Sequence, residues 1–260
     1  MIFTCQSNSL EELKLLASKD RHSVLIEGAP GCGKTYLARQ YASLLDVRDF
    51  NLVPAKVNEI RDTIDFCSQL ENTVVLCIEN LDKGVASSSY TLLKSLEEPA
   101  PNVYIVITCQ SINRVPDTIV SRSTVVSVSP PTDKDLDLFA RSVNPEKYLK
   151  WYQTPIWGCA RTFNDAMTIL SLQDEQINYI LSLSAICPFR DSVSNIVWKL
   201  GHFEDKSDTP IEIVIRYLME ILKSHHAQVS GIECISDLSL GRLAQHAVLS
   251  KFVFECKYVE

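Results

Sequence analysis

Eight consecutive residues near the start of the chain have the types and spacing of a phosphate-binding loop. They match the pattern G-x-x-x-x-G-K-[ST] and read Gly28-Ala29-Pro30-Gly31-Cys32-Gly33-Lys34-Thr35. In such a loop the glycines let backbone N–H groups surround a β-phosphate at a helix N-terminus, and the lysine neutralises β- and γ-phosphate oxygens. The Thr35 hydroxyl can coordinate Mg²⁺. The loop therefore predicts a site for a nucleotide and Mg²⁺.

The residues on either side of the loop supply the elements that must position it. A short apolar run from Ser23 to Glu27 predicts a strand, and a helical period resumes at Tyr36. Strand, glycine-rich turn and helix, in this order, are the context in which the pattern binds phosphate. This context favours nucleotide binding over the alternative, a chance glycine-rich turn.

A second group of polar residues follows the apolar run from Thr73 to Ile78, which predicts a buried strand. A P-loop protein that cleaves its nucleotide needs one carboxylate near Mg²⁺ and a second group that orients the attacking water. Glu79 can serve as the metal ligand. Asn80 occupies the second position, where it cannot act as a base, although its amide could position a water. Asp82 is an alternative carboxylate, and a merely polar strand end is a further interpretation.

Strands and helices alternate along the first half of the chain. Apolar runs predict strands at 23–27, 73–78, 103–108 and 125–129, with a short strand near Asn51. This alternation predicts an α/β fold whose parallel sheet is covered on both faces. After Pro131 the strand signals stop, and helices joined by polar segments follow. The first helix is expected to start at Ser9, which has capping-box spacing to Glu12, and a late helix at Pro210 after a Thr209 cap.

The composition excludes several classes of protein. Of the 260 residues, 46% are hydrophobic, and no apolar run reaches the roughly 18 residues that a membrane span needs. The N-terminus lacks the pattern of a secretory signal, and nine cysteines are scattered without a C-x-x-C pair. We therefore expect a soluble, cytoplasmic protein with reduced thiols. The net charge of −7 argues against a surface devoted to nucleic acid but leaves local DNA contacts open.

The stretch LLKSLEEPAPNVYIVITCQSINRVPDTIVSRS, from Leu92 to Ser123, resembles bacterial clamp-loader proteins, the AAA+ gamma and delta-prime subunits of DNA polymerase III. In that family an S-R-C sequence carries an arginine finger, and this chain has Ser121-Arg122-Ser123 at the corresponding place. The resemblance implies that Arg122 acts in trans on the γ-phosphate of ATP bound by an adjacent subunit. The alternative is an ordinary surface arginine.

The resemblance continues more loosely from Trp157 to Ala166, which is similar to the family sequence G-x-x-R-D-A-L. It implies that Arg161 is the sensor-2 residue, which touches the γ-phosphate in cis, whereas the alternative is an arginine on a helix surface. At the end of the sensor-1 strand, either Thr108 or Gln110 could take the place of the family's threonine. The family's four-cysteine zinc module is absent.

The resemblance also implies an organisation and a function. Residues 1–130 would form the AAA+ P-loop core, residues 131–174 a helical lid, and residues 175–260 an all-α collar for oligomerisation. The chain would bind ATP and Mg²⁺ within a five-subunit ring, and use ATP binding and hydrolysis to open a sliding clamp and load it on primer-template DNA. The setting would be the cytoplasm of a bacterial or phage-infected cell, with no membrane partner.

Two alternatives remain open at this point. The chain could be a non-hydrolysing stator like delta-prime, which contributes its arginine finger to a neighbour; Asn80 favours this alternative and the intact phosphate loop disfavours it. It could also be another AAA+ replication factor, such as a helicase loader, although such machines do not share the L-L-K-S-L-E-E-P and S-R-S sequences.

Overall fold

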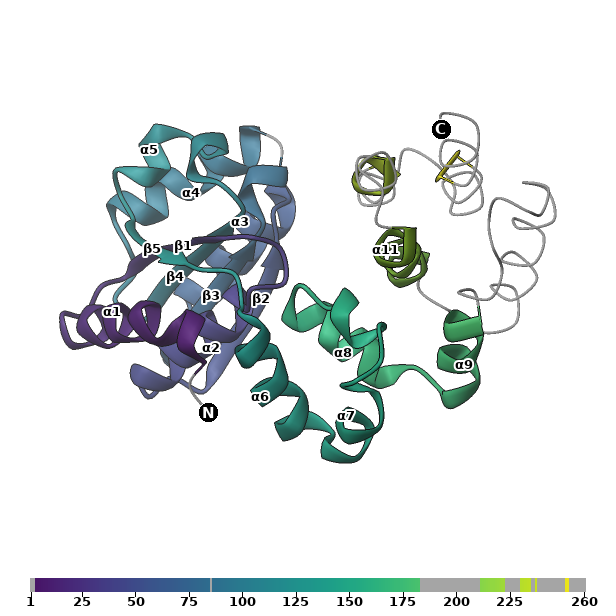
Figure 1. Ribbon diagram of the computed structural model, residues 1–260. Helices are drawn as coiled ribbons and strands as arrows, with labels where there is room; N and C mark the ends of the chain where they lie inside the picture. Colours follow the sequence, from purple (N-terminus) through teal and green to yellow (C-terminus); the bar gives the residue numbers. More distant parts are fainter. Residues whose placement is uncertain are drawn as a thin grey trace. The chain divides into compact units, whose positions relative to one another are not determined.

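The computed structural model describes residues 3–84, 86–182, 211–222, 230–234, 237 and 251–252. The chain divides into two compact units, Met1–Asp135 and Leu136–Glu260, which are treated separately below (Figure 1). The predicted cap Thr209 and first-turn Pro210 lie outside the described residues. The further division of the second half into a lid and a collar stays a prediction.

A five-stranded parallel sheet forms the centre of the first unit (Figure 1). The strand order is β2-β3-β4-β1-β5, so the strand before the phosphate loop lies between β4 and β5. The prediction of an α/β core with a parallel sheet is confirmed. The five strands are β1 (Ser23–Gly28), β2 (Asp49–Pro54), β3 (Val74–Glu79), β4 (Val103–Cys109) and β5 (Thr124–Val128).

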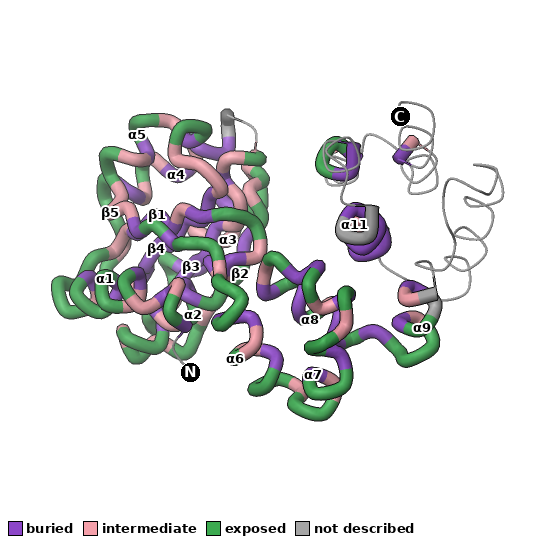
Figure 2. Tube along the Cα trace, viewed as in Figure 1, coloured by how far each residue is buried: buried purple, intermediate pink, exposed green. Residues whose placement is uncertain are grey.

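Helices cover both faces of this sheet, and each strand sends alternate side chains to opposite faces. In β3, Leu76 and Ile78 join the cluster that contains residues of α3 and α4, whereas Val75 and Cys77 join the cluster under α1 and α2. Burial on both faces explains why the central strands are continuous apolar runs in the sequence (Figure 2). The helices are α1 (Ser7–Ser18), α2 (Lys34–Leu44), α3 (Val57–Ser68), α4 (Ala86–Glu97) and the short α5 (Asp117–Val120).

The start of α1 differs from the sequence expectation. The helix begins at Ser7 after the 3-10 turn η1 (Thr4–Gln6), so Ser9 lies inside it and is not its cap. Ser9 is buried, and its hydroxyl donates to the carbonyl of Ser127 in β5 at 2.7 Å. The capping-box prediction was wrong because a tertiary partner takes the hydroxyl that the local pattern assigned to the helix end.

The described part of the second unit is helical. α6 (Asp133–Val143) begins just before the boundary, and α7 (Pro145–Trp151), the 3-10 turn η4 (Trp157–Cys159), α8 (Phe163–Ser171), α9 (Asp174–Ser182) and α11 (Ile211–Leu222) follow. In α11, the apolar side chains of Val214, Ile215 and Leu218 are buried. No helix in the described ranges is long and apolar enough to cross a membrane.

Candidate nucleotide site

The phosphate loop connects the end of β1 to the start of α2 through backbone conformations that require glycine. Gly31 and Gly33 have φ values of 69° and 91°, in the left-handed region that other residues rarely adopt. A Cβ on Gly28 would lie 2.8 Å from the Cys32 Sγ and 2.9 Å from the carbonyl oxygen of Val128. The glycine spacing seen in the sequence is therefore imposed by the turn itself and by its close approach to β5.

Lys34, the first residue of α2, points back into the loop. Its Nζ donates to the carbonyl oxygens of Gly28 and Ala29 at 2.7 and 2.9 Å, and the residue is only 8% exposed. A buried ammonium group needs such partners because burial without them costs several kcal/mol, by order of magnitude. The loop thus holds a positive charge at the N-terminus of α2, where an anion is also favoured by the helix dipole.

Thr35 and Glu79, the two predicted metal ligands, contact each other. The Thr35 hydroxyl donates to the Glu79 Oε1 at 3.0 Å, so the start of α2 and the end of β3 meet at this point. A hydroxyl and a carboxylate are the hard oxygen ligands that suit Mg²⁺. Among the described residues no group of three or more His, Cys, Asp and Glu side chains could hold a metal. Mg²⁺ here would take its other ligands from water and phosphate.

Asn80 follows Glu79 in a left-handed conformation, with φ 50° and ψ 53°. Asparagine tolerates this region far better than glutamate does, because its short side chain can bond locally. The backbone N–H of Asn80 donates to the Thr108 Oγ1 at 3.0 Å. Thr108, near the end of β4, therefore contacts the residue that follows β3, the strand that ends at Glu79. Gln110 lies one residue beyond β4 and is half-buried.

Asp82 places a second carboxylate near the ends of β3 and β4. It lies in the 3-10 turn η2 (Leu81–Lys83), and both carboxylate oxygens are buried with no hydrogen-bond partner in the described part of the chain. The pKa of the neighbouring Cys109 thiol rises to about 12, mainly through burial and then through the negative charges of Asp82 and Glu27. An unpartnered carboxylate at this edge gives the site a basic, negatively charged group, which the Asn80 amide does not supply.

Arg122 lies on the surface of the first unit, just after α5. Its Nη2 pairs with the Glu97 Oε1 at 2.6 Å, and its Nη1 donates to the carbonyl oxygen of Thr118 at 2.9 Å. The side chains of Arg122 and Glu97 are 36% and 52% exposed, so water screens the pair and its contribution is at most about 1 kcal/mol. Arg122 can therefore leave Glu97 and bind a phosphate with little loss of free energy.

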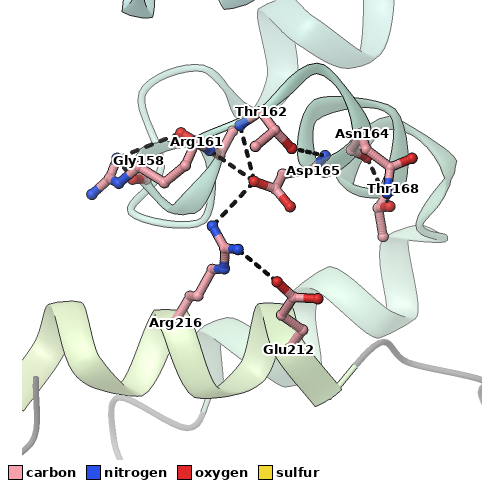
Figure 3. Close-up of polar contacts among 9 residues, drawn as sticks. Gly158, Arg161, Thr162, Asn164, Asp165, Thr168, Glu212 and Arg216 are labelled. Atoms are coloured by element: carbon pink, nitrogen blue, oxygen red, sulfur yellow. Dashed lines mark hydrogen bonds and ion pairs between the residues drawn. The ribbon is translucent and has the colours of Figure 1, made fainter. Parts of the chain in front are cut away.

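Arg161 lies in the loop before α8, not on a helix surface (Figure 3). Its Nη1 donates to the carbonyl oxygens of Gly158 and Ala160 at 2.6 and 3.4 Å. In the family pattern the aspartate directly follows the arginine, whereas three residues separate Arg161 from Asp165 here. Its sensor-2 role stays a prediction, since that role depends on the position of the second unit relative to the nucleotide.

Asp165 and Arg216 form a polar cluster around this loop that the sequence interpretation missed (Figure 3). Thr162 is the N-cap of α8, and Asp165 completes the capping box: its Oδ2 accepts from the backbone N–H groups of Arg161 and Thr162, each at 3.0 Å. Arg216, from α11, donates to the same oxygen at 3.1 Å and to Glu212 at 2.5 Å. The Thr162–Asp165 spacing is a readable capping signal, but no local pattern could assign the partner 51 residues away.

Comparisons with known proteins agree with the clamp-loader resemblance. A family model described as "DNA polymerase III, delta subunit" matches residues 53–132, a range that includes Glu79, Asn80 and Arg122. The sliding-clamp-loader large subunit of Escherichia phage RB69 is 30% identical over 139 residues, which cover 48% of this chain and 42% of that protein. The chain thus spans less than half of the length of this relative.

Solved structures share the fold at low sequence identity. A DNA polymerase III gamma subunit-related protein of Thermotoga maritima superposes with a TM-score of 0.55 and 14% identity, over 94% of this chain and 97% of that one. The RuvB Holliday junction branch migration motor of the same organism superposes with a TM-score of 0.54 and 15% sequence identity, over 96% of this chain and 87% of that one. The family model and the phage relative therefore confirm the resemblance to clamp-loader subunits that the sequence predicts, and the solved structures share the fold.

Proposed function

We propose that this chain is an ATP-binding subunit of a sliding-clamp loader. ATP and Mg²⁺ would bind at the loop from Gly28 to Thr35, with Lys34 on the β- and γ-phosphates and with Thr35 and Glu79 on the metal. Bound Mg²⁺ would neutralise charge on the phosphate oxygens. ATP binding would close a ring of subunits that opens the clamp for primer-template DNA, and hydrolysis would reset the ring.

The contact between Thr35 and Glu79 carries this proposal. A glycine-rich loop alone could be structural, but here its last hydroxyl lies 3.0 Å from a carboxylate at the end of β3. The carboxyl ends of parallel strands are where open α/β sheets bind ligands. Loop, lysine and carboxylate therefore meet at the edge of the sheet where a nucleotide with its metal is expected.

A non-hydrolysing stator is the second candidate function, and Asn80 is the observation that favours it. Its left-handed backbone suits asparagine, and an amide cannot remove a proton from water. In this version the subunit would hold ATP without turnover and contribute Arg122 to the site of a neighbour. The exposure of Arg122 supports such a role, because a residue that acts in trans must be accessible.

Partners and setting belong to the same proposal. The phage relative is named as a clamp-loader subunit, and on that likeness we infer assembly with other loader subunits in a five-membered ring, a sliding clamp and primed DNA. We place lid and collar at residues 131–174 and 175–260, with Arg161 as the sensor-2 arginine. The work of such a complex would take place in the cytoplasm of a bacterial or phage-infected cell.

The proposal is tested by reconstitution with the products of neighbouring replication genes. The chain should co-purify with them, and the complex should bind ATP. The ATPase rate should rise on addition of clamp and primed DNA if the chain is a motor subunit. ATP binding without a contribution to turnover would select the stator. Failure of the purified, folded chain to bind ATP, alone and in the complex, would refute the nucleotide site.

A further inference from the structure

The turn that precedes α1 reaches the middle of the phosphate loop. Gln6, the last residue of η1, is 3% exposed, and its Nε2 donates to the carbonyl oxygen of Cys32 at 2.9 Å. Cys32 itself is completely buried. One carbonyl of the loop is therefore held by a side chain from outside the loop, 26 residues away in the sequence.

This contact fixes the orientation of one peptide plane of the loop. The amide between Cys32 and Gly33 is planar and trans, so its N–H points opposite to its carbonyl. A carbonyl held towards Gln6 therefore directs the Gly33 N–H away from Gln6. Gly33 is the residue directly before α2, and N–H groups at this position of a phosphate loop bind the phosphate.

The turn that carries Gln6 is in turn anchored to a buried carboxylate. The backbone N–H of Thr4 donates to the Asp135 Oδ1 at 2.6 Å, and Asp135 is completely buried in the first turn of α6. The other oxygen of Asp135 accepts from the backbone N–H and the hydroxyl of Thr132, at 3.0 and 2.6 Å. These hydrogen bonds lower the pKa of Asp135 although burial alone would raise it.

We propose that Gln6 is a positioning residue for the nucleotide phosphate. It orients the Cys32–Gly33 peptide so that the Gly33 N–H faces the bound β-phosphate, and Asp135 holds the turn from which Gln6 reaches the loop. The inference deepens the proposed ATP site and rests on it. It also gives the chain upstream of the sheet a part in nucleotide binding that lies outside the eight-residue loop.

The chain offers a matched control for a merely structural hydrogen bond. Ser9 belongs to the same N-terminal segment, is 2% exposed, and donates from its side chain to a backbone carbonyl, that of Ser127 in β5. Loss of this bond should lower stability without moving the phosphate loop. Gln6→Met and Ser9→Ala therefore remove hydrogen bonds of the same kind from the same segment, and only the first bond ends on the loop.

The first measurement is the Kd for Mg-ATP by isothermal titration calorimetry on the full chain, together with the melting temperature without nucleotide. Gln6→Met should weaken ATP binding about five- to tenfold, the equivalent of one net hydrogen bond. Asp135→Asn should weaken it by a smaller factor, because the turn keeps its other contacts. The Kd of Ser9→Ala for Mg-ATP should stay within twofold of the wild-type value. The nucleotide-free melting temperature should fall comparably in Gln6→Met and Ser9→Ala.

The second measurement observes the peptide itself. The chain contains eight glycines, and Gly33 is the only one preceded by a cysteine. Labelling with ¹³C′-cysteine and ¹⁵N-glycine therefore gives a single amide correlation, that of the Cys32–Gly33 peptide. This signal should shift in Gln6→Met without nucleotide, should shift again on ATP addition in the wild type, and should stay in place in Ser9→Ala.

The possible outcomes separate the inference from the function on which it rests. If the wild type binds ATP and Gln6→Met binds it within twofold, or if Ser9→Ala loses as much affinity, the positioning role is wrong and the ATP site stands. If the wild type binds no ATP, either alone or in the assembled complex, both the positioning role and the ATP site are wrong. Should Gln6→Met fail to fold, Gln6→Asn replaces it, since that amide remains polar but is one methylene too short to reach Cys32.

Discussion

The phosphate loop and the Arg161 loop each hold a basic side chain on carbonyls of their own segment, yet they differ in what fixes them. Lys34 bonds to Gly28 and Ala29, and its loop is held by a strand, a helix and the facing Glu79, all within the first unit. Arg161 bonds to Gly158 and Ala160. Its loop is held by the helices of the second unit, and its proposed target lies outside that unit.

This difference shows which functional residues a pattern in the sequence can identify. When a loop functions through its own backbone, the function is visible in the spacing of its glycines. Each glycine is required either by a positive φ value or by the close approach of another segment. An arginine that acts on another unit, or on another subunit, needs only an accessible position on the surface, and local spacing does not specify such a position. The phosphate loop can therefore be tested by substitution alone, whereas Arg161 and Arg122 need assays that report on the proposed targets in another unit or subunit.

The largest effect is expected for Arg122→Ala, measured in the assembled complex. An arginine finger contributes about 10³- to 10⁵-fold to turnover in comparable sites. The variant should therefore nearly abolish ATP hydrolysis at the neighbouring site, while the ATP affinity of this chain stays unchanged.

Glu97→Gln is the control for Arg122, because it weakens the ion pair but leaves the arginine in place. It should retain the neighbour's turnover. Loss of ATP binding by this chain itself in Arg122→Ala would refute a role in trans and place Arg122 in its own site.

A smaller effect, about tenfold or more, is expected for Asn80→Glu on the steady-state ATPase rate of the complex. A carboxylate that orients or deprotonates the attacking water contributes roughly 10²- to 10⁴-fold in general. Part of this gain should be lost here because glutamate is strained at φ 50°. Asn80→Asp tolerates that conformation and serves as the comparison. An unchanged or lower rate in both variants would show that Asn80 does not limit turnover.

The smallest effect concerns the anchor of the Arg161 loop. Arg216→Met should lower the free energy of unfolding by about 1–2 kcal/mol, since it leaves the carboxylate of Asp165, 9% exposed, without its cation. Lys150→Met removes the exposed ion pair with Asp174 and should cost less than about 0.5 kcal/mol. Urea unfolding followed by circular dichroism measures both. Equal losses would mean that the Asp165–Arg216 pair contributes no more than a surface pair.

The sequence predicted the sheet well, because strands buried on both faces leave uninterrupted apolar runs. It also predicted the positions of Lys34, Thr35 and Glu79, since the loop pattern and a strand end specify them locally. It did not reveal three hydrogen bonds: from Gln6 to Cys32, from Ser9 to Ser127, and from Arg216 to Asp165. Each of these contacts joins residues 26 to 118 positions apart, and a hydroxyl or amide in a single sequence does not indicate which distant carbonyl or carboxylate it will meet.

The central claim, that the loop from Gly28 to Thr35 binds ATP, is tested most directly by calorimetric titration of Mg-ATP into the wild type and Lys34→Ala. The wild type should give a saturable isotherm with one site per chain, and the variant should lose at least about 100-fold in affinity because the charge on the phosphates is no longer neutralised. A folded variant that binds ATP within a few fold of the wild type would contradict the account and make the loop structural.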